Sequence, residues 1–308
     1  MELHITPRQV RGRLAGATSA ALLIALALAS PASAAKPIYD DSGRPRVGTY
    51  DPDDPAPLKL RLLELHERQR AGKMTAPEAD EWNHLIAANG LDPIGRLQPA
   101  AASSGSMTPM SLYVSKILAG TQRPQLKGYW CGPATAQSII LGWHNEKGNP
   151  TASDLDGKAL SQANLALSTY TNVEQDKGTD WIDKDMLRAL NRWLDTGGAD
   201  YYQVTPTSVG ALEGYVTLDV DIDWMLASDM VEAAGGAHYN HHPAARTIYH
   251  WTSIRGYADS GDTFSFQDPA ANTSVLPADW DGAAAYFSLS STSAYNFMTK
   301  VRTRGVAW

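Results

Sequence analysis

The hydrophobic residues of this chain change their spacing about two-thirds of the way along the sequence. In the first part they recur every three or four residues, as Leu58, Leu62 and Leu65 do, which is typical of amphipathic helices. From residue 216 to 223 apolar and polar residues alternate strictly, which predicts a half-buried strand. Helices followed by antiparallel strands predict an α+β fold.

Other signals place the individual elements. Glu78 stands three positions after Thr75, the pattern of a capping box, which predicts that a second helix of an N-terminal helical hairpin begins there. Three more helices are expected at 131–143, 154–167 and 182–194. Strands at 246–257 and 263–268 flank a Gly- and Asp-containing turn at 259–262, which predicts a β-hairpin.

The first 34 residues have the pattern of a secretory signal peptide. Three arginines precede an unbroken apolar stretch, AALLIALALA, and an Ala-Ser-Ala cleavage site follows it. The apolar stretch is too short to span a membrane. We therefore expect a secreted protein, extracellular or in the cell envelope, without a membrane anchor once residues 1–34 are removed.

Three segments follow the expected signal peptide. Residues 35–97 form a leader and a helical hairpin, which either docks on the main domain or acts as an inhibitory pro-segment. Residues 98–110 are rich in small residues and are expected to be a linker. Residues 111–308 form the main domain, and its oligomeric state is left open.

Charge and motifs exclude several classes of function. The net charge is −7 and no run of basic residues occurs, so we expect no nucleic-acid partner. No cofactor is expected, because the sequence has no glycine-rich phosphate loop. His238, His241 and His242 lie near Glu232 without a zinc-binding spacing, so a polar loop is favoured over a metal site. The alternating aspartates at 219–223 are interpreted as the solvated face of a strand rather than a calcium loop.

The only cysteine, Cys131, excludes an intramolecular disulfide. Gly132 and Pro133 follow it, and proline suits the first turn of a helix, so Cys131 is expected at a helix N-terminus. Unpaired N–H groups and the helix dipole favour a thiolate there. The alternative is a buried, inert thiol.

A nucleophilic cysteine needs a base, and His250 is the best placed histidine because it lies within an expected strand. If the hairpin turns near residues 260–261, His250 faces residues 268–271 on the partner strand. Asp268 falls at this level and could accept the His250 Nδ1–H, which would leave Nε2 for the thiol.

The sequence resembles cysteine peptidase family thirty-nine over residues 110–300. The resemblance rests on three motifs in the family's order: Tyr129-Trp130-Cys131-Gly132-Pro133-Ala134, Tyr249-His250-Trp251 and Phe266-Gln267-Asp268-Pro269. It implies a papain-like fold for residues 111–308, with Cys131 as nucleophile, His250 as general base and acid, and Asp268 as orienting carboxylate. Gln125, six residues before the cysteine, has the position of the family's oxyanion-binding glutamine.

The resemblance implies a secreted cysteine peptidase, or a related thiol amide hydrolase, acting on a peptide or protein substrate. Two alternatives remain open at this point. The chain could be a non-catalytic binding module on the same scaffold, because fold does not determine function. It could also transfer the acyl group to an amine, as an acyltransferase or transpeptidase.

Overall fold

The computed structural model describes residues 57–88, 91, 113–143, 151–173, 177–194 and 200–308. The expected signal peptide at 1–34, the leader up to residue 56 and the linker expected at 98–110 lie outside the described residues. Within the described part, seven α-helices accompany a seven-stranded antiparallel sheet, which confirms the α+β class. No helix in these ranges combines the length and the apolar composition that crossing a membrane requires.

The two helices expected near the N-terminus are present as α1 (Pro57–Arg70) and α2 (Ala76–Ala88). The predicted capping box, formed by Thr75 and Glu78, is present at the start of α2. The Glu78 carboxylate accepts hydrogen bonds from the backbone N–H and the hydroxyl of Thr75, each at 2.8 Å. The buried residues Leu58, Leu62 and Leu65 of α1 and Ala79, Trp82 and Ile86 of α2 belong to the main hydrophobic core.

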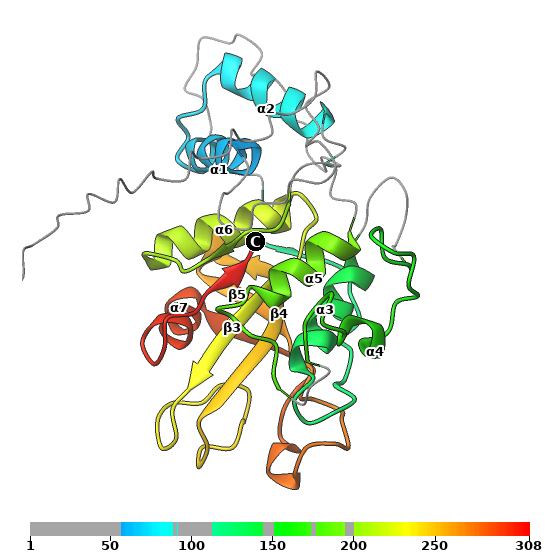
Figure 1. Cartoon of the computed structure of the whole chain (residues 1–308). Coiled ribbons are helices and arrows are strands. Elements are labelled where there is room, and N and C mark those ends of the chain that lie inside the picture. Colours follow the sequence, from blue (N-terminus) through cyan, green and yellow to red (C-terminus); the bar gives the residue numbers. More distant parts are fainter. Residues whose placement is uncertain (1–56, 89–90, 92–112, 144–150, 174–176, 195–199) are drawn as a thin grey trace, which may run out of the picture. The chain divides into compact units, whose positions relative to one another are not determined.

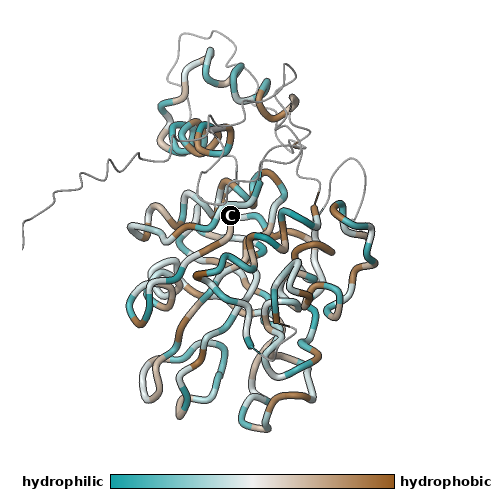
Figure 2. Tube along the Cα trace, in the orientation of Figure 1, coloured by the Kyte–Doolittle hydropathy of each residue, from teal (hydrophilic) through white to brown (hydrophobic). Residues whose placement is uncertain are grey.

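The strand predicted at 216–223 is wrong, because residues 216–221 form the second half of α6 (Val209–Asp221). The helix is capped by Ser208, whose hydroxyl accepts the N–H of Ala211 at 3.1 Å. Figure 2 shows both hydrophobic and hydrophilic positions along α6, and in the sequence the two kinds alternate over residues 216–221. The alternation was misleading because every residue from 216 to 221 is buried, so no polar stripe marks a solvent-facing side of the helix.

Two aspartates of α6, expected on a solvated face, are instead buried and paired with α1. Lys59 Nζ lies 3.1 Å from Asp219 Oδ1, and neither side chain is accessible to solvent. His66 Nε2 lies 2.8 Å from Asp221 Oδ2, and the Tyr257 hydroxyl donates to the other oxygen of Asp221 at 2.6 Å. Aromatic rings lie within about 5 Å of the Lys59 ammonium; they belong to Tyr201, Trp224 and Trp308.

Two of the three helices expected in the middle of the chain are confirmed, as α3 (Cys131–Gly142) and α5 (Asp185–Trp193). The helix predicted at 154–167 is wrong, because the segment consists largely of turns and bends and contains only the short α4 (Gln162–Leu165). The backbone N–H groups of residues 154 and 155 donate to the carbonyls of residues 193 and 192. These N–H groups therefore satisfy the C-terminal end of α5 instead of facing the next turn of a helix of their own.

The sheet has the strand order β2-β7-β3-β4-β5-β6. β3 pairs with the first part of β4, and β1 pairs with Gly256 and Tyr257 near the end of the same strand. Figure 1 shows β3 and β4 as long neighbouring strands. The strands are β1 (Lys116–Ile117), β2 (Gln203–Val204), β3 (Leu226–Glu232), β4 (Ile248–Ala258), β5 (Thr263–Gln267), β6 (Tyr286–Ser290) and β7 (Val306–Ala307). β4 and β5 are the predicted hairpin, and a short 3₁₀ turn at Asp259–Gly261 connects them.

Helices pack against the long central strands. Both α3 and α6 contact β4, and α7 (Ser291–Thr299) contacts β3. Near the start of α3 the Thr135 hydroxyl donates to the Trp251 carbonyl of β4 at 2.9 Å, in a buried hydrogen bond. The beginning of α3 is thereby fixed beside the middle of β4.

Candidate active site

Cys131 is the first residue of α3, where the backbone N–H groups have no carbonyl partner within the helix. The helical hydrogen bonds begin with the Ala134 N–H, which donates to the Trp130 carbonyl at 3.1 Å. Pro133 lies in the first turn, as the sequence predicts. The positive end of the helix dipole at this position stabilises a thiolate, the form in which a cysteine acts as a nucleophile.

Gly132, next to the cysteine, is required by close packing, and Gly132→Ala should destabilise the protein. A Cβ at this position would overlap the side chain of Thr179. Thr179 is itself held in place, because its backbone carbonyl accepts the Trp251 Nε1–H at 3.0 Å. Overpacking of this kind costs about 1–3 kcal/mol. Chemical denaturation measures the loss. Gly128→Ala is the control, because a Cβ there makes only an ordinary contact, and equal stabilities of the two variants would contradict the packing argument.

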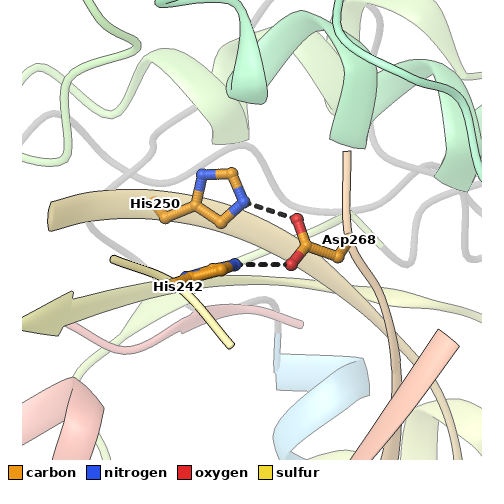
Figure 3. A group of neighbouring side chains, drawn as sticks. All are labelled: His242, His250 and Asp268. Carbon is orange, nitrogen blue, oxygen red and sulfur yellow. Dashed lines mark hydrogen bonds and ion pairs between the residues drawn. The ribbon is translucent and has the colours of Figure 1, made fainter. Parts of the chain in front are cut away.

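His250 lies in β4, and Asp268 directly follows β5 in the same hairpin. The observed pairing of Tyr257 with Phe264 agrees with the turn position from which the sequence analysis placed Asp268 opposite His250. His250 Nε2 lies 2.8 Å from Asp268 Oδ1, and the two side chains point toward one another in Figure 3. Both residues are buried, with exposed fractions of 3% and 0%.

The roles predicted for the two ring nitrogens of His250 are wrong. Nε2, which was expected to face the thiol, contacts Asp268 instead. Nδ1 is then the nitrogen left for Cys131, which is among the groups that raise the pKa of His250. This arrangement agrees with the packing of α3 directly on the β4 main chain, because Nδ1 is the ring nitrogen nearer to the backbone.

The three side chains influence one another electrostatically. Burial lowers the pKa of His250, but the charge of Asp268 and the hydrogen bonds of Asp268 and Cys131 outweigh it and raise this pKa to about 10. Burial alone would raise the pKa of Asp268, but two histidines outweigh it and hold this pKa well below its ordinary value. At neutral pH Asp268 is therefore a carboxylate and His250 an imidazolium, the partner that a thiolate requires.

Asp268 has a second imidazole on its other oxygen, which the sequence analysis missed. His242 Nε2 lies 2.7 Å from Asp268 Oδ2, so that each of the two histidines contacts its own oxygen of the carboxylate (Figure 3). Asn240 Nδ2 donates to the same Oδ2 at 2.6 Å, and the Ala270 N–H donates to Oδ1 at 2.8 Å. Every contact of the Asp268 carboxylate thus comes from a donor or from a titratable ring nitrogen.

The three neighbouring histidines lie in the loop between β3 and β4, and two of them are bonded to carboxylates. His242 is buried, with both ring nitrogens bonded to carboxylates, and His238 Nδ1 lies 2.6 Å from Glu232. His241 is exposed and has a positive φ of 58°, as does Asn240 at 48°. The irregular backbone at 240–241 turns neighbouring side chains in different directions, so no sequence spacing could have identified His242. The only signal was the number of histidines close to Glu232.

An aromatic side chain covers the histidine pair. The ring of Trp280 lies 4.7 Å from the ring of His242 and 5.9 Å from that of His250, measured between centroids. Trp280 is itself partly exposed. Its ring limits the access of water to the hydrogen bonds of Asp268, which strengthens them by keeping the local dielectric low.

Gln125 lies in the segment before α3 and is anchored to the loop that follows Asp268. Its N–H donates to the Pro269 carbonyl at 2.9 Å, and its carbonyl accepts the Thr273 hydroxyl at 2.6 Å. Its side chain is buried, and Nε2 donates to the Lys127 carbonyl at 2.9 Å. This hydrogen bond uses one of the two Nε2 hydrogens. The oxyanion-binding role of Gln125 stays a prediction.

One group of side chains has the composition of a metal site. His242, His250 and Asp268 offer three ligand atoms that lie within 4.8 Å of one another, and histidine with carboxylate is a common donor set for divalent cations. In this structure the same atoms are hydrogen-bonded to each other at 2.7–2.8 Å. The geometry is thus fully accounted for by a carboxylate between two imidazoles.

Comparison with known proteins places the chain in a family. A family model described as "Peptidase_C39 like family" matches residues 117–293, more than half of the chain. The chain belongs to the peptidase C39-like family. The C39-like region contains Cys131, His250 and Asp268, and α1 and α2 lie outside it. No curated protein and no solved structure matches the chain.

Proposed function

We propose that the protein is a secreted cysteine peptidase, or a closely related thiol amide hydrolase, with a papain-like catalytic domain. The observation that carries the proposal is the His250–Asp268 pair, 2.8 Å apart, on the strand against which the start of α3 packs, with Cys131 as the first residue of that helix. Membership of the peptidase C39-like family supports it. The signal-peptide pattern at 1–34 supports the secreted location.

In the proposed reaction the Cys131 thiolate attacks the carbonyl carbon of a peptide bond, and the carbonyl electrons move onto the oxygen. The Cys131 N–H and the free Nε2 hydrogen of Gln125 stabilise this oxyanion; a single donor of this kind contributes about 3 kcal/mol. The His250 imidazolium donates its Nδ1 proton to the leaving amine as the C–N bond breaks, which produces a thioester and a neutral imidazole.

The second half of the reaction releases the acid product. Neutral His250 accepts a proton from water through Nδ1, and the resulting hydroxide equivalent attacks the thioester. The C–S bond then breaks and restores the thiolate beside the imidazolium. Asp268 stays ionised throughout and fixes the ring through Nε2. Because the imidazolium is the required acid, activity should fall only as the pH approaches the His250 pKa of about 10.

The proposal is tested by the reactivity of Cys131 toward iodoacetamide. We expect rapid alkylation at pH 6, slowed about 10- to 100-fold by His250→Ala, because an ordinary thiol is less than about 1% ionised at that pH. His84→Gln is the matched control, since His84 is an exposed histidine of α2. Cleavage of a peptide library by the same preparation identifies the substrate class.

Two outcomes would overturn the proposal. Alkylation only after unfolding would show that the thiol is inert, as expected for a binding module on this scaffold. Rapid alkylation together with acyl transfer to added amines in preference to water would indicate a transferase instead of a hydrolase.

A further inference from the structure

The hydrogen bonds at Asp268 continue away from the cysteine through a second row of titratable side chains. His242 bridges two carboxylates, with Nε2 at 2.7 Å from Asp268 and Nδ1 at 2.9 Å from Glu232. The other oxygen of Glu232 lies 2.6 Å from His238 Nδ1. His238 Nε2 ends the row at 2.9 Å from the Ala233 carbonyl.

The protonation state of His242 follows from its partners. An ionised carboxylate only accepts hydrogen bonds, so a ring with a carboxylate at each nitrogen must donate from both nitrogens. A ring that carries both protons is an imidazolium. Burial lowers the pKa of His242, but the hydrogen bonds to Asp268 and Glu232 outweigh it and raise this pKa above its ordinary value, which agrees with this assignment.

The row ends at His238. Its Nε2 donates to the Ala233 carbonyl, because a carbonyl oxygen has no proton to offer, and its Nδ1 lies against Glu232. His242 therefore lies between two carboxylates, and Asp268 lies between two imidazole rings. Partners of opposite charge stabilise buried ionised groups.

We propose that His242 and Glu232 are positioning residues, which hold the Asp268 carboxylate ionised and oriented toward His250 through a second imidazolium. This inference rests on the proposed function, because it assigns these residues a part in maintaining the Cys131–His250 ion pair. Glu232 has this effect by keeping His242 protonated at both nitrogens. Asn240 alone would leave Oδ2 of Asp268 with a single neutral donor.

His242 also adjusts the charge around His250. The two imidazolium rings lie 5.2 Å apart, and the charge of His250 lowers the pKa of His242. Charge repulsion is mutual, so the His242 charge opposes the effect of Asp268 on His250. Other ionisable groups that act on this row are Asp229 of β3, which is paired with Arg304, and Tyr239. Removing the His242 charge should therefore make His250 lose its proton at higher pH, and removing the Asp268 charge should have the opposite effect.

The experiment compares three variants of the row by the rate of Cys131 alkylation as a function of pH. His242→Ala removes the donor and the charge, and we expect a rate about 100-fold lower near neutral pH, because the catalytic carboxylate loses its orientation. His242→Gln keeps a donor at the Nε2 position without the charge. It should recover most of the alkylation rate, and the change in rate that accompanies the loss of the His250 proton, the alkaline limb of the profile, should move to higher pH. Glu232→Gln should resemble His242→Gln.

Two controls separate this effect from general damage. His241→Asn changes the neighbouring exposed histidine to a residue that tolerates its positive φ, and it should leave rate and profile unchanged. Asp268→Asn should shift the alkaline limb to lower pH, the opposite direction to His242→Gln. Melting temperatures of all variants show whether each protein is folded.

The outcomes are distinct from those of the proposed function. Alkylation requires the ion pair but no peptide substrate, so a protein that cleaves no peptide and still responds to His242→Ala would support the positioning role and overturn the peptidase assignment. Unchanged alkylation profiles in folded His242→Ala and Glu232→Gln, with peptide cleavage intact, would overturn the positioning role alone. If His242→Ala lowers the alkylation rate, His242→Gln fails to recover it and the alkaline limb does not shift, His242 acts through packing alone.

Discussion

Replacing Cys131 with alanine should abolish peptide hydrolysis, with a loss of at least about 10⁴-fold in kcat. The loss is this large because no other group in the row of side chains can form the thioester. The melting temperature should change by less than about 4 °C, since the substitution removes one sulfur atom from a side chain at the edge of the core. Initial rates on the best library peptide and a thermal melt measure both effects.

Cys131→Ser is the matched control for this prediction. It keeps an atom in place of the sulfur, but a hydroxyl does not ionise beside an imidazolium, so we expect a loss nearly as large. A Cys131→Ala protein that retains its activity would mean that hydrolysis takes place elsewhere on the chain.

Replacing Lys59 with methionine should lower the free energy of unfolding by about 3–5 kcal/mol, the largest stability effect that we expect from one substitution. Lys59 and Asp219 form an ion pair from which solvent is excluded. Burial raises the pKa of Asp219 to about 6 although Lys59 opposes the shift, so the carboxylate is already costly to keep ionised. Without the ammonium it would be left without its counterion.

Urea denaturation measures this loss, and two further variants interpret it. Arg61→Ala, two residues along α1, removes a partly exposed ion pair with Glu81 and should cost less than about 1 kcal/mol. Lys59→Met combined with Asp219→Leu should recover much of the stability, because both charges are then gone. Equal effects of Lys59→Met and Arg61→Ala would show that the buried pair does not hold α1 on α6.

The sequence predicted the elements whose signals are local. The capping box at Thr75, the proline after Cys131 and the turn at 259–262 each depend on a few neighbouring residues, and each element was found where it was expected. Cross-strand counting even placed Asp268 within reach of His250, since hairpin register follows from the position of the turn.

The errors arose where partners come from distant parts of the chain. Asp219 and Asp221 looked like a solvated face because their partners, Lys59 and His66, lie about 160 residues earlier. Without those partners in view, buried carboxylates cannot be told from exposed ones. His242 was missed for a related reason: it reaches Asp268 from an irregular loop, and loop backbone angles are not encoded in a hydrophobic period.

The division of the candidate triad between a helix and a β-hairpin has a consequence for biosynthesis. Cys131 meets His250 only when α3 has packed on β4, which is synthesised more than a hundred residues later. Until that packing is complete the nascent chain carries an ordinary, weakly reactive thiol. The emerging polypeptide is therefore protected from its own nucleophile during synthesis, and the proposed hydrolytic competence arises only when this packing is complete.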